Sequence, residues 1–131
     1  MVNVFLDTDV TFDIIGKREP YSKISIEFVK LSSIRKLVLN ISEVSMANLC
    51  YLSFETYKLP SANKNLSDFI KYCNILPSGK KIFLQALESD FKDKEDGIQY
   101  FTALDHEMDY FITRNVKDYS NFTSRLLVLS P

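Results

Sequence analysis

The first residues of the chain form a short apolar segment that ends in two carboxylates. Residues 2–6 read Val-Asn-Val-Phe-Leu, and Asp7 and Asp9 follow. Such a segment is typical of a buried strand, and in open α/β sheets ligands bind beyond the carboxyl ends of parallel strands. Carboxylates gathered at that edge repel one another unless a cation neutralises them. The opening of the chain therefore predicts a parallel sheet with a hard divalent-metal site at its edge.

The rest of the chain alternates apolar strand patterns with amphipathic helical patterns. The predicted strands cover residues 2–6, 37–41, 110–113 and 126–129. The predicted helices cover residues 8–15, 43–58, 63–73, 79–89 and 94–107, and Ser42 is the predicted N-cap of the helix over 43–58. A further helix is predicted to begin at Pro20, and its inward side chains are expected to be Ile24, Ile26, Phe28, Val29 and Leu31. Strands separated by helices favour parallel pairing through right-handed crossovers. The pattern therefore predicts an α/β fold with a central parallel sheet.

Length and composition restrict the class of protein. A chain of 131 residues suits one domain, residues 1–131, and 46% hydrophobic residues suffice for a core. With a net charge of -1, any contact with nucleic acid requires a local basic patch. Cys50 and Cys73 are expected to be buried thiols in helical surroundings, as in a reducing cytosol. No segment reaches the roughly 18 apolar residues of a membrane span, so we expect a soluble cytoplasmic protein with no membrane contact.

Three acidic residues from distant parts of the sequence are predicted to meet at one edge of the sheet. Asp7 ends the first strand, Asp96 begins the helix over 94–107, and Asp118 follows the third strand. Strand ends and the helix starts that follow them share an edge in a parallel sheet. Each acid also has a structural interpretation, Asp7 as a helix cap, Asp96 as a first-turn acid and Asp118 as a turn residue. Their joint placement favours a common site.

Five stretches resemble motifs of PIN-domain proteins, the family that includes the VapC-type toxins of bacterial toxin–antitoxin pairs. These stretches are Val4–Asp9, Lys17–Pro20, Ile41–Leu49, Asp93–Gly97 and Ile112–Tyr119. The resemblance spans nearly the whole chain, and its most specific stretch is the last. It implies a three-layer α/β/α PIN-like fold with a central parallel sheet of four to five strands. It also implies an Mg²⁺- or Mn²⁺-dependent endoribonuclease, a cognate antitoxin and a homodimer.

The same resemblance assigns roles to individual residues. Asp7, Asp96 and Asp118 match the metal-binding acids of the family, and Asp9 and Asn115 match polar positions that shape the site. Asp7 and Asp96 would be the primary ligands, while Asp118 would bind a second metal or orient the attacking water. A bound metal lowers the pKa of water and takes charge from the phosphate, so no protein base is required.

One position departs from the family pattern. Asn48 stands where many members have glutamate, and an amide oxygen can coordinate Mg²⁺ or hold a bound water but adds no charge. We expect Asn48 to position a water in the catalytic site and the metal to bind more weakly than with a fourth carboxylate. Glu43 lies five residues earlier and is not expected to replace the missing acid, because it leaves the helix on a different side.

Four cations near the motifs are candidates for RNA phosphate contacts. Lys17 and Arg18 follow the first helix, and Arg114 and Lys117 lie in the fourth motif. The alternative for each is an ordinary solvated charge. His106 falls late in a helix, where its charge complements the helix dipole, and is not expected to act as a base.

Two further features of the sequence concern surfaces that a protein partner could cover. Tyr51, Phe54 and Tyr57 recur at spacings of three, which fits either core packing or a dimer surface. The chain stops at Leu129-Ser130-Pro131, where related sequences run on into a further helix, so a sheet face is expected to be left for a partner.

Three functions compete at this point. The first is the metal-dependent ribonuclease, the toxin of a toxin–antitoxin pair. The second is a catalytically weak or inactive PIN-like domain that binds RNA or a protein, which Asn48 and the acidic pI of about 5.8 favour. The third is a small α/β phosphatase or a receiver domain, which ranks lower because the required aspartate and lysine pattern is not present.

Overall fold

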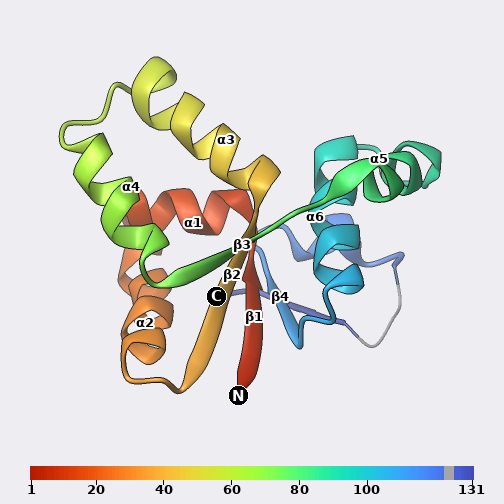
Figure 1. The fold of residues 1–131 in the computed structure, drawn as a ribbon, viewed down its shortest axis with the longest axis horizontal. Coiled ribbons are helices and arrows are strands. Elements are labelled where there is room, and N and C mark those ends of the chain that lie inside the picture. Colours follow the sequence, from red (N-terminus) through yellow and green to blue (C-terminus); the bar gives the residue numbers. More distant parts are fainter. Residues whose placement is uncertain (123–125) are drawn as a thin grey trace.

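The computed structural model describes residues 1–122 and 126–131 and contains a five-stranded parallel sheet (Figure 1). The strands lie in the order β3-β2-β1-β4-β5. Their bounds are β1 (Val2–Leu6), β2 (Leu37–Ser42), β3 (Cys73–Leu76), β4 (Tyr110–Ile112) and β5 (Leu127–Leu129). All four neighbouring pairs are parallel, and Leu6 at the end of β1 pairs with Ile112 at the end of β4. The segments that follow β1 and β4 therefore start side by side.

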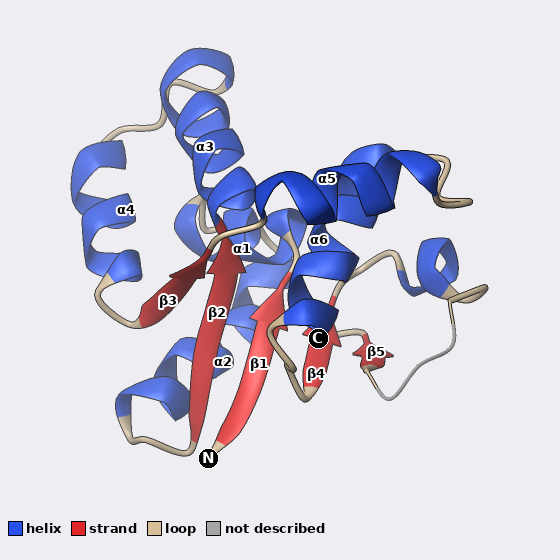
Figure 2. Ribbon diagram, turned by 45° about the vertical axis from the view of Figure 1, so that its right-hand side comes forward, coloured by secondary structure: helices blue, strands red, loops and turns tan. Residues whose placement is uncertain are grey.

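Helices cover both faces of this sheet (Figures 1 and 2). One face carries α1 (Thr8–Ile15), α2 (Tyr21–Ser33), α3 (Glu43–Tyr51) and α4 (Ala62–Ile70), and the other carries α5 (Gly79–Glu88) and α6 (Lys94–Asp105). Two short helices, a π-helix over Leu52–Thr56 and a 3₁₀-helix over Val116–Tyr119, follow α3 and β4. The predicted three-layer α/β/α fold with a parallel sheet is confirmed.

The central strand β1 contributes to both cores because its side chains alternate between the two faces. Val4 and Leu6 pack with residues of α1, α3 and α4. Phe5 packs on the opposite face with Phe111, whose ring is stacked at a centroid distance of 5.3 Å, and with Tyr100 of α6. A strand buried on both faces is what an almost continuous apolar sequence predicts.

The edge strand β3 was not predicted. The amphipathic pattern over 63–73 predicted a helix through Cys73, but α4 ends at Ile70 and Cys73 begins the strand. A four-residue edge strand with Asn74 and Ile75 exposed shows no alternation that the sequence could reveal. Both cysteines are half-buried, and burial raises the pKa of the Cys73 thiol to about 12.

Two helices also differ from their predicted form. Ile26, Phe28 and Val29 pack against the core as expected, but Ile24 and Leu31, also expected inside α2, are 59% and 39% exposed. The helix buries Ser22 and Ser25 as well. The helix predicted over 43–58 changes to π-helical geometry after Tyr51, where the Tyr57 amide donates to the Leu52 carbonyl at 2.9 Å.

The aromatic stripe predicted for that helix lies on the surface. Tyr51, Phe54 and Tyr57 are 64%, 40% and 55% exposed, which removes core packing as their main role. In the described parts of the chain, we find no helix long and apolar enough to cross a membrane.

Candidate functional site

Strand β1 delivers Asp7 to the carboxyl edge of the sheet. The Asp7 amide donates to the Ile112 carbonyl at 2.9 Å, which continues the pairing of β1 with β4. Its carboxylate accepts from the Thr8 amide at 2.8 Å, as an N-cap of α1, and from the Thr113 hydroxyl at 2.8 Å. Asp7 is only 5% exposed, so the strand, the cap and the neighbouring strand fix its position together. The structural interpretation of Asp7 as a helix cap is therefore correct, and the cap leaves the residue at the edge of the sheet.

Six acidic side chains surround one hollow at this edge, which we call the acid cleft. The cleft has a volume of about 380 Å³. It is lined by Asp7, Thr8, Asp9, Asn48, Tyr51, Leu52, Asp93, Glu95, Asp96, Asn115 and Asp118. The three acids from distant parts of the sequence thus lie on one cleft, together with Asn48, Asp9 and Asn115. Sequence reasoning did not single out Asp93 or Glu95.

A buried chain of polar side chains lies beneath the cleft and connects the elements around it. The Ser42 hydroxyl donates to Gln99 Oε1 at 2.7 Å, and Gln99 Nε2 donates to the Thr8 hydroxyl at 3.2 Å. The Thr8 and Ser45 hydroxyls lie 2.9 Å apart, and Ser42 also caps α3 by accepting from the Ser45 amide. All four residues are buried, so these bonds form away from water and fix α1, α3 and α6 relative to one another.

The first turn of α6 brings three acids to the cleft. Asp93 is the N-cap, and its carboxylate accepts from the Glu95 amide at 2.9 Å and the Asp96 amide at 3.3 Å. The Asn48 side chain on α3 donates to the Glu95 carboxylate. The carboxylate that Asn48 itself lacks is therefore present one contact away, on α6. The contact between Asn48 and Glu95 could not be predicted from the sequence, because the two residues lie 47 positions apart and meet only through the packing of α3 and α6.

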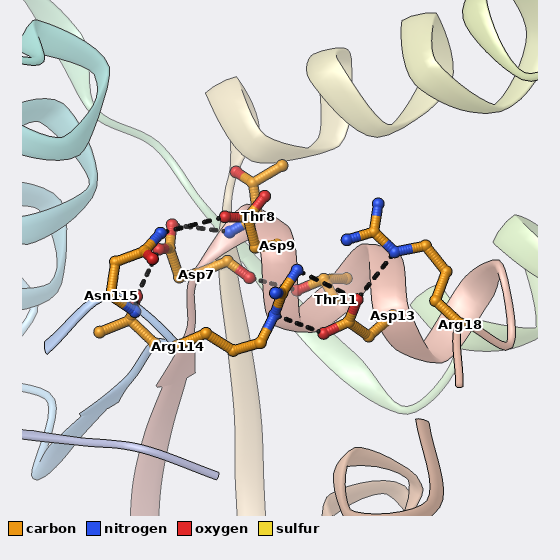
Figure 3. A network of polar contacts seen from close by, with 9 residues as sticks. Asp7, Thr8, Asp9, Thr11, Asp13, Arg18, Arg114 and Asn115 are labelled. Atoms are coloured by element: carbon orange, nitrogen blue, oxygen red, sulfur yellow. Dashed lines mark hydrogen bonds and ion pairs between the residues drawn. The ribbon is translucent and has the colours of Figure 1, made fainter. Parts of the chain in front are cut away.

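The fourth motif closes the cleft from the side of β4. The backbone N–H of Asn115 donates to the Thr113 hydroxyl at 3.1 Å. The side-chain Nδ2 of Asn115 donates to Asp9 Oδ2 at 3.3 Å (Figure 3). Asp118 follows in the 3₁₀-helix over Val116–Tyr119. Asp9 and Asn115 thus hold two edges of the cleft together.

Burial, with the charges of neighbouring acids added to it, raises the pKa of three carboxyl groups in the cleft. Burial raises the pKa of Asp7 to about 6, with Asp9 and Glu95 adding to the rise and the hydrogen bonds from Thr113 and Thr8 opposing it. Burial also raises the pKa of Asp96 to about 7.

For Asp96, the neighbouring charges of Asp93, Asp7 and Asp118 add to the effect of burial, and the Tyr119 hydroxyl opposes it. Burial likewise raises the pKa of Glu95. Two carboxyl groups that titrate near neutral pH beside further carboxylates form a site that a cation would stabilise in its ionised form.

The donor set fits a hard divalent cation. The polar side chains that line it offer carboxylate, amide and hydroxyl oxygens, and carboxylate and carbonyl oxygens are the ligands that Mg²⁺ and Mn²⁺ prefer. Within residues 1–122 and 126–131, no three Asp, Glu, His or Cys side chains already converge on a single ion position. The acids instead surround a cavity that is large enough for an ion with its waters.

Two of the predicted phosphate-binding cations form ion pairs behind the cleft. Arg114 Nε lies 2.9 Å from Asp13 Oδ2, and Arg18 Nε lies 2.9 Å from Asp13 Oδ1 (Figure 3). The Asp13 side chain is completely buried, and the guanidinium of Arg114 also lies over the Tyr21 ring at 4.0 Å. One carboxylate between two guanidiniums gives this group of three side chains a net charge of +1 next to the acid cleft.

The two predicted lysines, Lys117 and Lys17, differ in their distance from the acid cleft. Lys117 borders a hollow of about 280 Å³ that shares Asp93, Asp96 and Asp118 with the acid cleft. Lys17 lines two hollows beside α1, α2 and α4, and neither of these two contains an acid of the cleft. His106 ends α6, as predicted, with Nε2 2.9 Å from the Pro77 carbonyl oxygen.

Comparison with known proteins identifies one family. A family model described as a PIN domain matches residues 3–117 of the chain. No curated protein gives a significant match to the chain.

Several solved structures share the fold. A structure of VapBC2 from Rickettsia felis, bound to a DNA fragment from its promoter, matches with a TM-score of 0.74 and 17% identity over 99% of both chains. A toxin–antitoxin complex from Klebsiella pneumoniae matches with a TM-score of 0.67 and 20% identity over 95% of both chains. VapC20 from Mycobacterium tuberculosis, described as a sarcin–ricin loop cleaving toxin, matches with a TM-score of 0.70 and 9% identity over 93% of this chain and 97% of that one. At these identities the likeness shows the fold.

Proposed function

The chain belongs to the PIN-domain family, and from that premise we propose that it is a metal-dependent endoribonuclease, the toxin of a toxin–antitoxin pair. The observation that carries the proposal is the acid cleft, in which six carboxylates from three parts of the chain surround one hollow at the carboxyl edge of the sheet. Packing alone does not account for so many neighbouring carboxylates, since each one raises the free energy of ionising the next.

The residues of the cleft divide into ligands and positioning groups. Asp7, Asp96 and Asp118 would hold Mg²⁺ or Mn²⁺, which when bound activates water and neutralises charge on the phosphate. Thr113 fixes the orientation of the Asp7 carboxylate through its 2.8 Å hydrogen bond. Asn48 holds Glu95 at the rim and, in a catalytic role, would position a water through its amide.

We further propose that Glu95 supplies the charge that Asn48 lacks. Glu95→Gln is expected to weaken Mn²⁺ binding roughly tenfold, because it removes one carboxylate from the cleft while keeping the hydrogen bond from Asn48 within reach. Isothermal titration calorimetry measures this change. Glu43→Gln is the matched control, since Glu43 is exposed in the first turn of α3 and does not line the cleft. Equal Mn²⁺ affinities for the two variants would remove Glu95 from the ligand set.

The RNA strand is proposed to pass through the cleft between two cations. Lys117 borders the hollow on one side of the acids, and Arg114 lies next to Asn115 on the other. Both would contact phosphates, and Arg18 would support Arg114 through the shared Asp13. Lys17 is proposed as a more distant phosphate contact.

Incubation of the protein with a single-stranded RNA tests the function. We expect cleavage in Mn²⁺ or Mg²⁺, loss of cleavage in EDTA, and a rise in the thermal unfolding midpoint when Mn²⁺ is added, because the ion binds only the folded acid cleft. A rise in the midpoint without cleavage of any RNA would favour the alternative, a PIN-like domain that binds RNA or protein. No effect of millimolar Mn²⁺ on either measurement would contradict the metal site.

Protein partners complete the proposal. VapBC2 and the complex from Klebsiella pneumoniae are toxin–antitoxin structures, and by analogy we propose an antitoxin for this chain. We also propose a homodimer, for which the exposed stripe of Tyr51, Phe54 and Tyr57 is a candidate surface. We propose the cytoplasm as the place where the protein acts, because an RNA substrate would be met there.

A further inference from the structure

A second hollow lies directly beside the acid cleft, and we call it the Tyr21 hollow. It has a volume of about 310 Å³. It is lined by Tyr21, Ile24, Ser25, Arg114, Asn115, Ser130 and Pro131. Asn115 borders both this hollow and the acid cleft, so the two hollows adjoin at this residue.

Ser25 places an unpartnered polar atom at the buried side of this hollow. The residue is 0% exposed, and its hydroxyl has no hydrogen-bond partner among the described residues. A buried hydroxyl without a partner costs free energy, so its presence at a hollow points to a ligand that completes the bond.

The wall of the hollow combines an aromatic ring with a fixed cation. The Arg114 guanidinium lies 4.0 Å from the centre of the Tyr21 ring and is held there by Asp13, whose side chain is fully buried. Tyr21 and Ile24 are 44% and 59% exposed, so this apolar surface is open to a ligand. The arginine pair on Asp13 leaves one positive charge at the hollow.

These groups match one class of ligand. A nucleotide offers a planar base that stacks on an aromatic ring, polar edges that hydrogen-bond a hydroxyl, and a phosphate that pairs with arginine. We propose that the Tyr21 hollow is a nucleotide subsite, in which a base of the RNA strand packs on Tyr21, the Ser25 hydroxyl contacts its edge, and Arg114 binds the adjoining phosphate. The inference rests on the proposed function, since the strand that fills this subsite is the one whose phosphodiester lies in the acid cleft.

Fluorescence anisotropy with a labelled short single-stranded RNA tests the subsite. The measurement uses the Asp96→Asn background, so that the RNA stays intact. We expect Tyr21→Ala to weaken RNA binding about tenfold, since the stacking of one base is lost. Tyr21→Phe keeps the ring and is expected to stay within about twofold of the parent. Tyr72→Ala is the matched control, because Tyr72 is 47% exposed and lines a hollow between α2 and α4 instead.

Ser25→Ala separates a binding role from a structural one. Removal of an unpartnered buried hydroxyl is expected to leave the unfolding midpoint unchanged or higher. A threefold or greater loss of RNA affinity in this variant would therefore come from the ligand and not from the fold.

The outcomes distinguish the subsite from the nuclease. If Tyr21→Ala and Ser25→Ala bind RNA like the parent while the wild type cleaves RNA, the subsite is wrong and the nuclease stands. If RNA binding depends on Tyr21 but no RNA is cleaved, the subsite stands and the nuclease does not. Loss of antitoxin binding in Tyr21→Ala with RNA binding intact would make the hollow a protein contact and overturn the assignment. A wild type that neither binds nor cleaves RNA would overturn both.

Discussion

Replacing Asp96 by asparagine is expected to slow metal-dependent RNA cleavage by roughly 10²- to 10³-fold, as the loss of a preorganised charge at a reacting centre does in other enzymes. Asp96 lies in the first turn of α6 among Asp93, Asp7 and Asp118, and burial together with these charges raises its pKa to about 7. Asparagine keeps the size and the oxygen of the side chain but removes the charge that attracts the cation. The effect should therefore appear in the chemical step and in Mn²⁺ affinity together.

Single-turnover cleavage at saturating Mn²⁺, with calorimetry of Mn²⁺ binding, measures both quantities. The fold should remain intact, because removing a charge from a crowded group of carboxylates relieves repulsion. Asp105→Asn is the control at the other end of the same helix, where Asp105 is exposed and lies 3.5 Å from Lys81 Nζ. Cleavage by Asp96→Asn within threefold of the wild-type rate would exclude Asp96 from the ligand set.

The central strands of the sheet could be predicted from the sequence because their apolar sequence pattern agrees with their burial in the fold. The apolar run Val4-Phe5-Leu6 predicts a strand buried on both faces, and the structure divides these side chains between two cores. The edge strand β3 carries no such signal, since half of its side chains are exposed. For Ile24, helical periodicity placed the side chain inside, whereas α2 packs Ile26, Phe28 and Val29 against the core, buries two serines and leaves Ile24 exposed.

Part of the acid cleft could be predicted from the sequence for a different reason. Asp7, Asp96 and Asp118 follow strand or helix boundaries, and the topology of a parallel sheet brings such boundaries to one edge. Glu95 joins them through a contact with Asn48 that depends on how α3 and α6 pack, which no sequence pattern encodes. Asp13 did carry a signal. It lies between Phe12 and Ile14 in a helix that is buried almost throughout, and a carboxylate there requires charged partners from elsewhere in the chain.

The second large effect is expected on stability, from that same residue. Asp13→Asn should lower the free energy of unfolding by about 3–5 kcal/mol, the usual cost of removing one partner from a buried ion pair. The Asp13 carboxylate is 0% exposed, accepts a hydrogen bond from Arg18 Nε at 2.9 Å and forms an ion pair with Arg114 Nε at the same distance. Asparagine has nearly the same shape but leaves the two guanidiniums beside each other without a counter-charge. Urea denaturation followed by circular dichroism measures the change.

Asp68→Asn provides the matched comparison, because Asp68 also pairs with two cations, Lys64 at 2.8 Å and Lys71 at 3.6 Å, but on the surface of α4. Exposed ion pairs contribute about 0–1 kcal/mol, so this variant should stay near wild type. The contrast isolates burial as the cause, since both sites place one carboxylate between two cations. A loss for Asp13→Asn as small as that for Asp68→Asn would mean that Arg18 and Arg114 can turn to solvent when released. Arg114 would then not be fixed beside the Tyr21 ring, and the nucleotide subsite would lose the rigid cation on which it depends.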